Sequence, residues 1–187
     1  MIYNSKQLYT PPLETYEFGE PALLIDTETI GTGPLVEIVE IAIGNTQGEI
    51  LFESLVQPIY NPIPPRSKHH RFEPNEIKNA PVWTEVWPEV SRFTEDRLLI
   101  AYNAPFDRRA IAASCYRHRQ SSNESGWRCA MQLLKQTMGV QRSPTLEQAC
   151  AYYGLPGGNH RAARDVLALG ELLRQVTMTV AAEPSPT

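Results

Sequence analysis

The sequence predicts an α/β domain in which a central sheet is flanked by helices. Three apolar segments early in the chain are joined by short connectors that contain glycine, which is the pattern of an antiparallel β-meander. One more apolar strand follows near the middle of the chain, and helical patterns fill most of the remainder. A meander followed by mixed strands and helices indicates a three-layer α/β or α+β arrangement.

The strands are expected where apolar runs are bounded by turn residues. The second run places Val36 and Ile38 on one face and Val39 and Ile41 on the other. Because both faces are then partly apolar, this strand is expected in the interior of the sheet. The expected strands are 22–25, 35–43, 49–56 and 98–102.

Helical patterns predominate after the meander. A Pro-rich loop and short helical pieces follow the third strand, and a short segment surrounds Trp127. Trp83 and Trp87 lie four residues apart, and we interpret them as core packing rather than as a platform for stacked bases. The longer helices are expected near 106–116, 131–138, 145–153 and 162–176.

The length of 187 residues suits one domain, which we place at 21–178. An N-terminal arm at 1–20 precedes it, and a tail at 179–187 is expected to be disordered. The net charge is −4, and no apolar run approaches the roughly 20 residues that span a bilayer. Three scattered cysteines suit neither a zinc site nor a disulfide framework, so we expect them to be buried and reduced. These features predict a cytoplasmic protein with no membrane partner.

Two acids follow the first strand directly. Asp26 and Glu28 are separated by one residue, so on a strand both carboxylates point to the same face. Like charges held this close repel each other unless a cation lies between them. The pair therefore favours a metal site to which other acids contribute.

A third acid follows the later strand, in the stretch "IAYNAPFDRRAI". Pro105 suits the first turn of a helix, where its missing N–H costs nothing, and Asp107 then lies in the same turn. A carboxylate there is also favoured by the helix dipole alone, so a simple helix-start acid is the alternative interpretation. Asn103 is either a turn former or a residue that supports the site.

The last helix supplies two more candidates, in "GGNHRAARDVLALGELLRQV". Asp165 falls on the apolar stripe of this helix with Leu169, Leu172 and Val176, which is unusual because an unpaired buried carboxylate is costly. His160 would lie on a different face of a continuous helix, so it can share a site with Asp165 only from the loop before it. A structural histidine is the alternative.

The order of these residues resembles the DEDD exonucleases. Asp-x-Glu at the first strand, Asn-x-x-Phe-Asp after a later strand and His-x4-Asp at the last helix are similar to the DnaQ-like branch with a motif histidine, the DEDDh group. Within that group "AYNAPFDRRAI" and "GWRCAMQLLKQ" look most similar to the exodeoxyribonuclease X type. The resemblance covers roughly residues 23–176. It implies a ribonuclease H-like fold, with a mixed central sheet, a three-strand antiparallel meander and flanking helices.

The resemblance also implies roles for individual residues. His160 is expected to deprotonate the attacking water, and four acids are expected to hold two Mg²⁺ or Mn²⁺ ions. Ile30 is expected either to meet the terminal base or to be a core residue. The implied metal ligands are Asp26, Glu28, Asp107 and Asp165, and the implied substrate contacts are Thr27, Thr29, Ile30 and Asn103.

The implied function is a 3′→5′ exonuclease that releases nucleoside 5′-monophosphates from DNA and prefers single-stranded 3′ ends. Two alternatives stay open: a 3′ exoribonuclease or oligonucleotide degrader, and a subunit that mainly binds a partner in a replication, repair or other nucleic-acid-processing complex. Arg161 and Arg164 are expected either to line a phosphate backbone or to form a solvated face.

Overall fold

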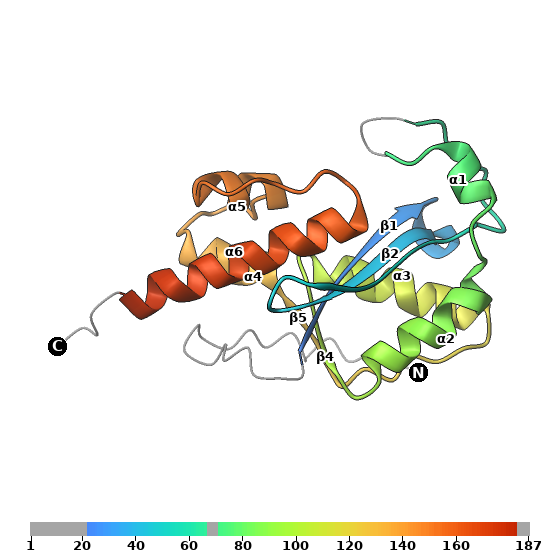
Figure 1. Ribbon diagram of the computed structural model, residues 1–187, viewed down its shortest axis with the longest axis horizontal. Coiled ribbons are helices and arrows are strands. Elements are labelled where there is room, and N and C mark those ends of the chain that lie inside the picture. The colour runs from blue at the N-terminus through green and yellow to red at the C-terminus, as the bar shows by residue number, and fades with distance from the viewer. Residues whose placement is uncertain (1–21, 67–70, 183–187) are drawn as a thin grey trace.

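The computed structural model describes residues 22–66 and 71–182. Within these ranges five strands form one sheet in the order β3-β2-β1-β4-β5, with helices on both of its faces (Figure 1). The predicted arm at 1–20 lies outside the described residues. The strands are β1 (Leu23–Ile30), β2 (Glu37–Asn45), β3 (Ile50–Leu55), β4 (Leu98–Ala101) and β5 (Gly126–Cys129), and the helices are η2 (Gly33–Leu35), α1 (Pro74–Lys78), α2 (Trp83–Thr94), α3 (Ala104–Arg117), α4 (Ala130–Thr137), α5 (Leu146–Tyr152) and α6 (Ala162–Ala182).

The sheet is mixed. Strands β1, β2 and β3 pair antiparallel in chain order, which confirms the predicted meander, while β4 runs parallel to both β1 and β5. Strand β2 lies between β1 and β3 and is buried along nearly its whole length, so the prediction of an interior strand is confirmed. Strand β1 is the middle strand, with neighbours on both sides.

Strand β1 is longer than predicted, and this changes where the acids lie. The sequence analysis placed Asp26 and Glu28 after the strand, but β1 continues through both of them to Ile30. The reason is pairing, because Asp26 faces Ala42 and Glu28 faces Glu40 across the long strand β2. A β-bulge follows Glu28. The carboxylates therefore lie on regular, paired backbone, just before the point where the pairing register of β1 and β2 shifts.

Three other elements differ from the expectation. The second strand begins at Glu37 rather than at residue 35, because the one-turn helix η2 comes first, and the segment around Trp127 is strand β5. Helix α2 runs for 12 residues where only short helical pieces were predicted. Trp83 and Trp87 stack in it at 5.3 Å between ring centroids and are almost fully buried, which confirms the core interpretation.

Each face of the sheet has its own core. Side chains of α2 and α3 pack with one face, and those of α4, α5 and α6 pack with the other. Figure 1 shows these two groups of helices on opposite sides of the strands. The three cysteines are free and buried, as predicted. Alternation along the strands produces this division, since successive side chains such as Leu23 and Leu24 enter different cores.

Helix α6 extends beyond residue 178, where we placed the end of the domain: residues 179–182 of the expected tail are helical. The stretch from 177 to 182 contains neither glycine nor proline, and the first proline after the helix is Pro184. The residue before a proline is biased away from helix, which fits an end near this point. Residues 183–187 lie outside the described ranges. No described helix combines the length and the apolar character that crossing a bilayer requires.

Candidate active site

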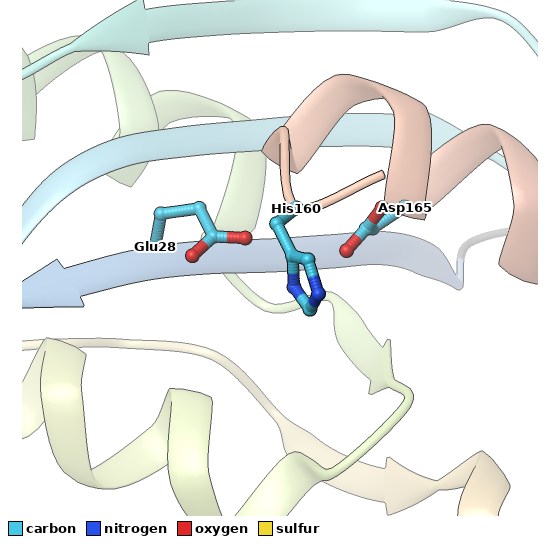
Figure 2. Close-up of side chains that lie close together, drawn as sticks. All are labelled: Glu28, His160 and Asp165. Atoms are coloured by element: carbon cyan, nitrogen blue, oxygen red, sulfur yellow. The ribbon is translucent and has the colours of Figure 1, made fainter. Parts of the chain in front are cut away.

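Three predicted site residues meet where α6 begins beside β1. Glu28 projects from β1, Asp165 from the first turn of α6 and His160 from the loop before that helix (Figure 2). One potential ligand atom of each residue lies within 4.8 Å of those of the other two. The prediction that His160 reaches the site from the loop, and not from the helix, agrees with this placement.

Asp107 reaches strand β1 from helix α3, which packs on the opposite face of the sheet from α6. It is 3% exposed, and its Oδ1 accepts hydrogen bonds from the N–H of Thr27 at 3.0 Å and from Thr27 Oγ1 at 2.8 Å. Pro105 lies in the first turn of α3, as predicted. Asp107 is thus more than a helix-start acid, because its carboxylate is held directly against the residue between Asp26 and Glu28.

The loop before α6 is shaped around Asp165. The N–H of Asn159 donates to Asp165 Oδ1 at 2.8 Å, and a side chain at Gly158 would place a Cβ atom only 2.1 Å from that oxygen. His160 has a φ of 58°, in the left-handed region, and its Nε2 lies 3.7 Å from Glu147 Oε1. The glycine is therefore required by close approach, and the histidine is held in a conformation that non-glycine residues seldom adopt.

Burial and mutual repulsion raise the pKa of the carboxyl groups. Burial, then the charges of Asp165 and Glu40, raise the pKa of Glu28 to about 8. Burial raises the pKa of Asp107 to about 7, although the two hydrogen bonds from Thr27 act in the opposite direction. Burial is also the first cause of the raised pKa of Asp26 and of Asp165. The charge of Asp107 raises the pKa of Asp26 further.

Such a group of carboxylates suits a hard divalent cation. With pKa values of about 8 and about 7, Glu28 and Asp107 hold protons over part of the neutral range, and a cation bound among the acids would remove the repulsion that those protons relieve. Carboxylate oxygens are the ligands that Mg²⁺ and Mn²⁺ prefer. The donor set and its electrostatics therefore fit the metal site that the sequence predicts.

Sequence reasoning missed a fifth acid, Glu40. It is 4% exposed on β2, opposite Glu28, and it binds the guanidinium of Arg161 and the backbone N–H of Ala162. The signal in the sequence is an acid in the middle of the apolar run "VEIVEIAIG". An interior strand buries both faces, so an acid in it needs a partner.

The predicted substrate contacts have mixed placements. Thr27 is 4% exposed and both of its donors go to Asp107, while Ile30 packs in a small core with Val39, Phe72 and Ile77, which is the core alternative. Asn103 is exposed at the start of α3, and its carbonyl accepts a hydrogen bond from the N–H of Phe106, the geometry of a turn former. Thr29 is partly buried just past the bulge.

Comparison by sequence identifies exonucleases. The signature of the RNase T exonuclease family matches residues 23–173. An uncharacterized exonuclease, CP81, of Escherichia phage 186 is 34% identical over 90 residues, which is 48% of this chain and 46% of the relative. A DNA polymerase III subunit epsilon-like protein of Rhodobacter capsulatus is 35% identical over 105 residues, 51% of this chain and 14% of the relative. The chain thus spans less than half the length of these relatives.

Comparison by structure identifies nuclease folds. The nuclease domain of 3′hExo, a DEDDh family member bound to rAMP, superposes with a TM-score of 0.69 at 18% identity, covering 86% of this chain and 92% of that domain. The Mg²⁺- and Mn²⁺-bound form of S. pombe Pop2p superposes with a TM-score of 0.60 at 12% identity, covering 81% of each chain. The mixed sheet with its meander is the ribonuclease H-like fold.

Proposed function

The chain belongs to the RNase T exonuclease family, with the DnaQ-like order of acids and histidine, and from this premise we propose that it is a metal-dependent 3′→5′ exonuclease. The observation that carries the proposal is the convergence of Glu28, His160 and Asp165 beside a strand that also holds Asp26. Glu28 comes from β1, His160 and Asp165 come from the start of α6 and the loop before it, and Asp107 contacts β1 from α3, so distant parts of the chain meet at this strand.

The metal ligands in this proposal are Asp26, Glu28, Asp107 and Asp165, which would hold two ions. Their raised pKa values support it, as does the presence of Mg²⁺ and Mn²⁺ in the structural neighbour Pop2p. When bound, divalent ions supply positive charge that stabilises the attacking and leaving oxygens of an in-line displacement. The hydrogen bonds from Thr27 to Asp107 orient one of these ligands.

In the proposed reaction His160 accepts a proton from the attacking water at an imidazole nitrogen. The water oxygen forms a bond to phosphorus as the bond from phosphorus to the 3′ oxygen of the preceding nucleotide breaks. That oxygen is protonated, and the products are a nucleoside 5′-monophosphate and a strand one unit shorter. Glu147, on α5, lies beside His160, with its Oε1 3.7 Å from the imidazole Nε2.

We propose single-stranded DNA 3′ ends as the substrate. The similarity to a polymerase III epsilon-like protein supports DNA. RNA is the second candidate, because the neighbour 3′hExo was observed with rAMP. The contacts proposed for the terminal nucleotide are Thr29 and the main chain around Thr27 and Ile30.

The test uses linear DNA and RNA strands of the same sequence, labelled at the 5′ or the 3′ end, with Mg²⁺, Mn²⁺ or EDTA. We expect a ladder of products shortened from the 3′ end, faster on single strands than on blunt duplex, and none in EDTA. A D26N/E28Q double variant is the control for contaminating nucleases. Cleavage of a circular single strand, shortening from the 5′ end or full activity in EDTA would refute the proposal.

The alternative of a partner-binding subunit is tested with the same substrates. The match covers 51% of this chain and 14% of a relative that is named as a polymerase subunit, and this name supports activity that depends on a partner as the second candidate. Inactivity of the isolated chain, together with capture of a defined nucleic-acid-processing protein and activity of the resulting complex, would favour this alternative.

A further inference from the structure

The fifth acid, Glu40, connects β2 to the segment in which the loop bearing His160 leads into the helix bearing Asp165. Its oxygens lie 2.9 and 3.1 Å from Nε of Arg161, and Oε2 also accepts a hydrogen bond from the N–H of Ala162 at 3.2 Å. Glu40 and Arg161 lie 121 residues apart in the sequence. One buried carboxylate therefore fixes two successive residues of a distant segment.

That segment is the one whose placement matters for the proposed chemistry. Arg161 directly follows His160, which has a left-handed φ of 58°, and Ala162 is the first residue of α6, whose first turn contains Asp165. A residue with a side chain remains at such a φ only where its surroundings hold it there. The contacts from Glu40 act on the next two residues.

We propose that Glu40 and Arg161 are positioning residues that fix the turn 160–162 on strand β2, so that His160 and Asp165 face Glu28. The catalytic consequence rests on the proposed exonuclease function, whereas the structural part does not depend on it. Neither residue needs to touch the substrate for this role.

A role as a simple helix cap does not explain the choice of a carboxylate. A neutral Ser, Thr or Asn at a helix start satisfies the same kind of N–H. A buried carboxylate is costly unless it is paired, and the charge of Glu40 raises the pKa of the nearby Asp26 and Glu28. Arg161 offsets that charge and lowers the pKa of Glu28. The ion pair thus provides two directional contacts on adjacent residues at little net charge, which one neutral cap cannot do.

Charge-preserving substitutions test the proposal. Glu40→Asp keeps the charge but is one methylene too short to keep both contacts, and Arg161→Lys keeps the charge but lacks the Nε donor. Because a displacement of about 1 Å can cost on the order of 100-fold in rate, we expect each variant to lower kcat by about 10- to 100-fold with KM changed by no more than a few-fold. If the pair acted only through its charge, both variants would retain wild-type kcat.

The matched control is Glu37→Asp on the same strand. Glu37 is 5% exposed and accepts hydrogen bonds from the backbone N–H groups of Ile59, Tyr60 and Asn61. It makes the same type of contact to a loop that contains none of the five motif residues. We expect this variant to lower the melting temperature and to keep kcat.

Amide hydrogen exchange gives a readout that needs no activity. Glu40→Asp should reduce protection in residues 158–165, and Glu37→Asp should reduce it only near 59–61. If the wild-type protein shows no exonuclease activity, the proposed function fails, and the exchange measurement alone then decides whether Glu40 fixes the turn. Unchanged protection at 158–165, or lost protection with wild-type kcat, would overturn the positioning role.

Discussion

At the scale of single residues, the site depends on burial and on close approach. Glu28 has a pKa raised to about 8 because it is partly buried beside other acids, and Asp165 occupies its place because Gly158 has no side chain. The two effects are physically different. One sets the protonation state of a ligand, and the other sets where the ligand can be.

The glycine pair before His160 allows a matched comparison. A Cβ at Gly158 would lie 2.1 Å from Asp165 Oδ1, whereas a Cβ at Gly157 would be in ordinary contact with Glu147 at 3.4 Å. We expect Gly158→Ala to displace Asp165 and lower activity by at least about tenfold, since misplaced ligands cost up to about 100-fold. Gly157→Ala should stay near wild type. Equal activity of the two variants in the same assay would contradict this account.

We expect His160 to take a proton from the attacking water, while the four acids bind the metal ions. A positioned general base contributes typically about 10²- to 10⁴-fold to rate, so removing the imidazole should lower kcat by that order. His160→Asn is the better variant and His160→Ala the second, because Asn tolerates the left-handed φ observed here. The melting temperature gained on adding Mn²⁺ should be nearly unchanged. Turnover within a few-fold of wild type would make the structural interpretation of His160 the better one.

At the scale of elements, two helices begin at the strand that carries the first two acids. The first turn of α3 brings Asp107 to Thr27, and the first turn of α6 brings Asp165 to Glu28. Carboxylates are favoured at helix N-termini by the helix dipole. The fold thus places acids where the helices favour their charged forms, which offsets part of the penalty of burial.

The contact between Thr27 of β1 and Asp107 of α3 can be weakened by a substitution that keeps the shape of the side chain. Thr27→Val removes the hydroxyl donor to Asp107 and keeps the backbone donor, while Thr27→Ser keeps both. Because a hydrogen bond to a charged group contributes about 1.5–3 kcal/mol, the Val variant should hold the Asp107 proton more tightly. We expect it to need a higher Mn²⁺ concentration for half-maximal activity, with Ser close to wild type. Titrations that coincide for all three proteins would disprove the link.

At the scale of the whole molecule, the site makes stability depend on pH and on metal. The pKa of Glu28 rises from an ordinary value near 4.5 to about 8, and that of Asp107 to about 7. At a pH between the ordinary pKa of each carboxyl and its raised pKa in the folded protein, the metal-free folded state binds more protons than the unfolded chain. Its free energy of unfolding therefore falls as pH rises. The stability that each of these protonated carboxyls contributes is fully present below its pKa in the unfolded chain. It is lost as pH rises through its pKa in the folded protein.

Melting temperatures measured from pH 5.5 to 8.5 test this dependence. In EDTA we expect the melting temperature to fall across this range. Mn²⁺ should raise it, and more at pH 8 than at pH 5.5, because the ion binds the carboxylates that have lost their protons. In the D26N/E28Q variant both trends should be weaker. A flat or rising profile in EDTA would show that these groups are not protonated in the folded protein.

The sequence by itself determined the meander and the interior position of β2, and it predicted the five motif residues from their order along the chain and the resemblance that this order carries. The meander and the interior strand depend on local signals, namely apolar periodicity and turn residues. It also indicated that His160 can share a site with Asp165 only from the loop before the helix, because residues 160 and 165 cannot share one face of a helix.

Only the tertiary structure decided what each acid contacts and how far β1 extends. Thr27 holds Asp107 across 80 residues, and Glu40 holds Arg161 across 121 residues. No local pattern indicates such pairs, because each side chain alone is compatible with a surface role. The length of β1 likewise depends on a partner strand that lies alongside it. Contacts between distant segments are created by packing, so they appear only once the sheet and its two layers of helices are assembled.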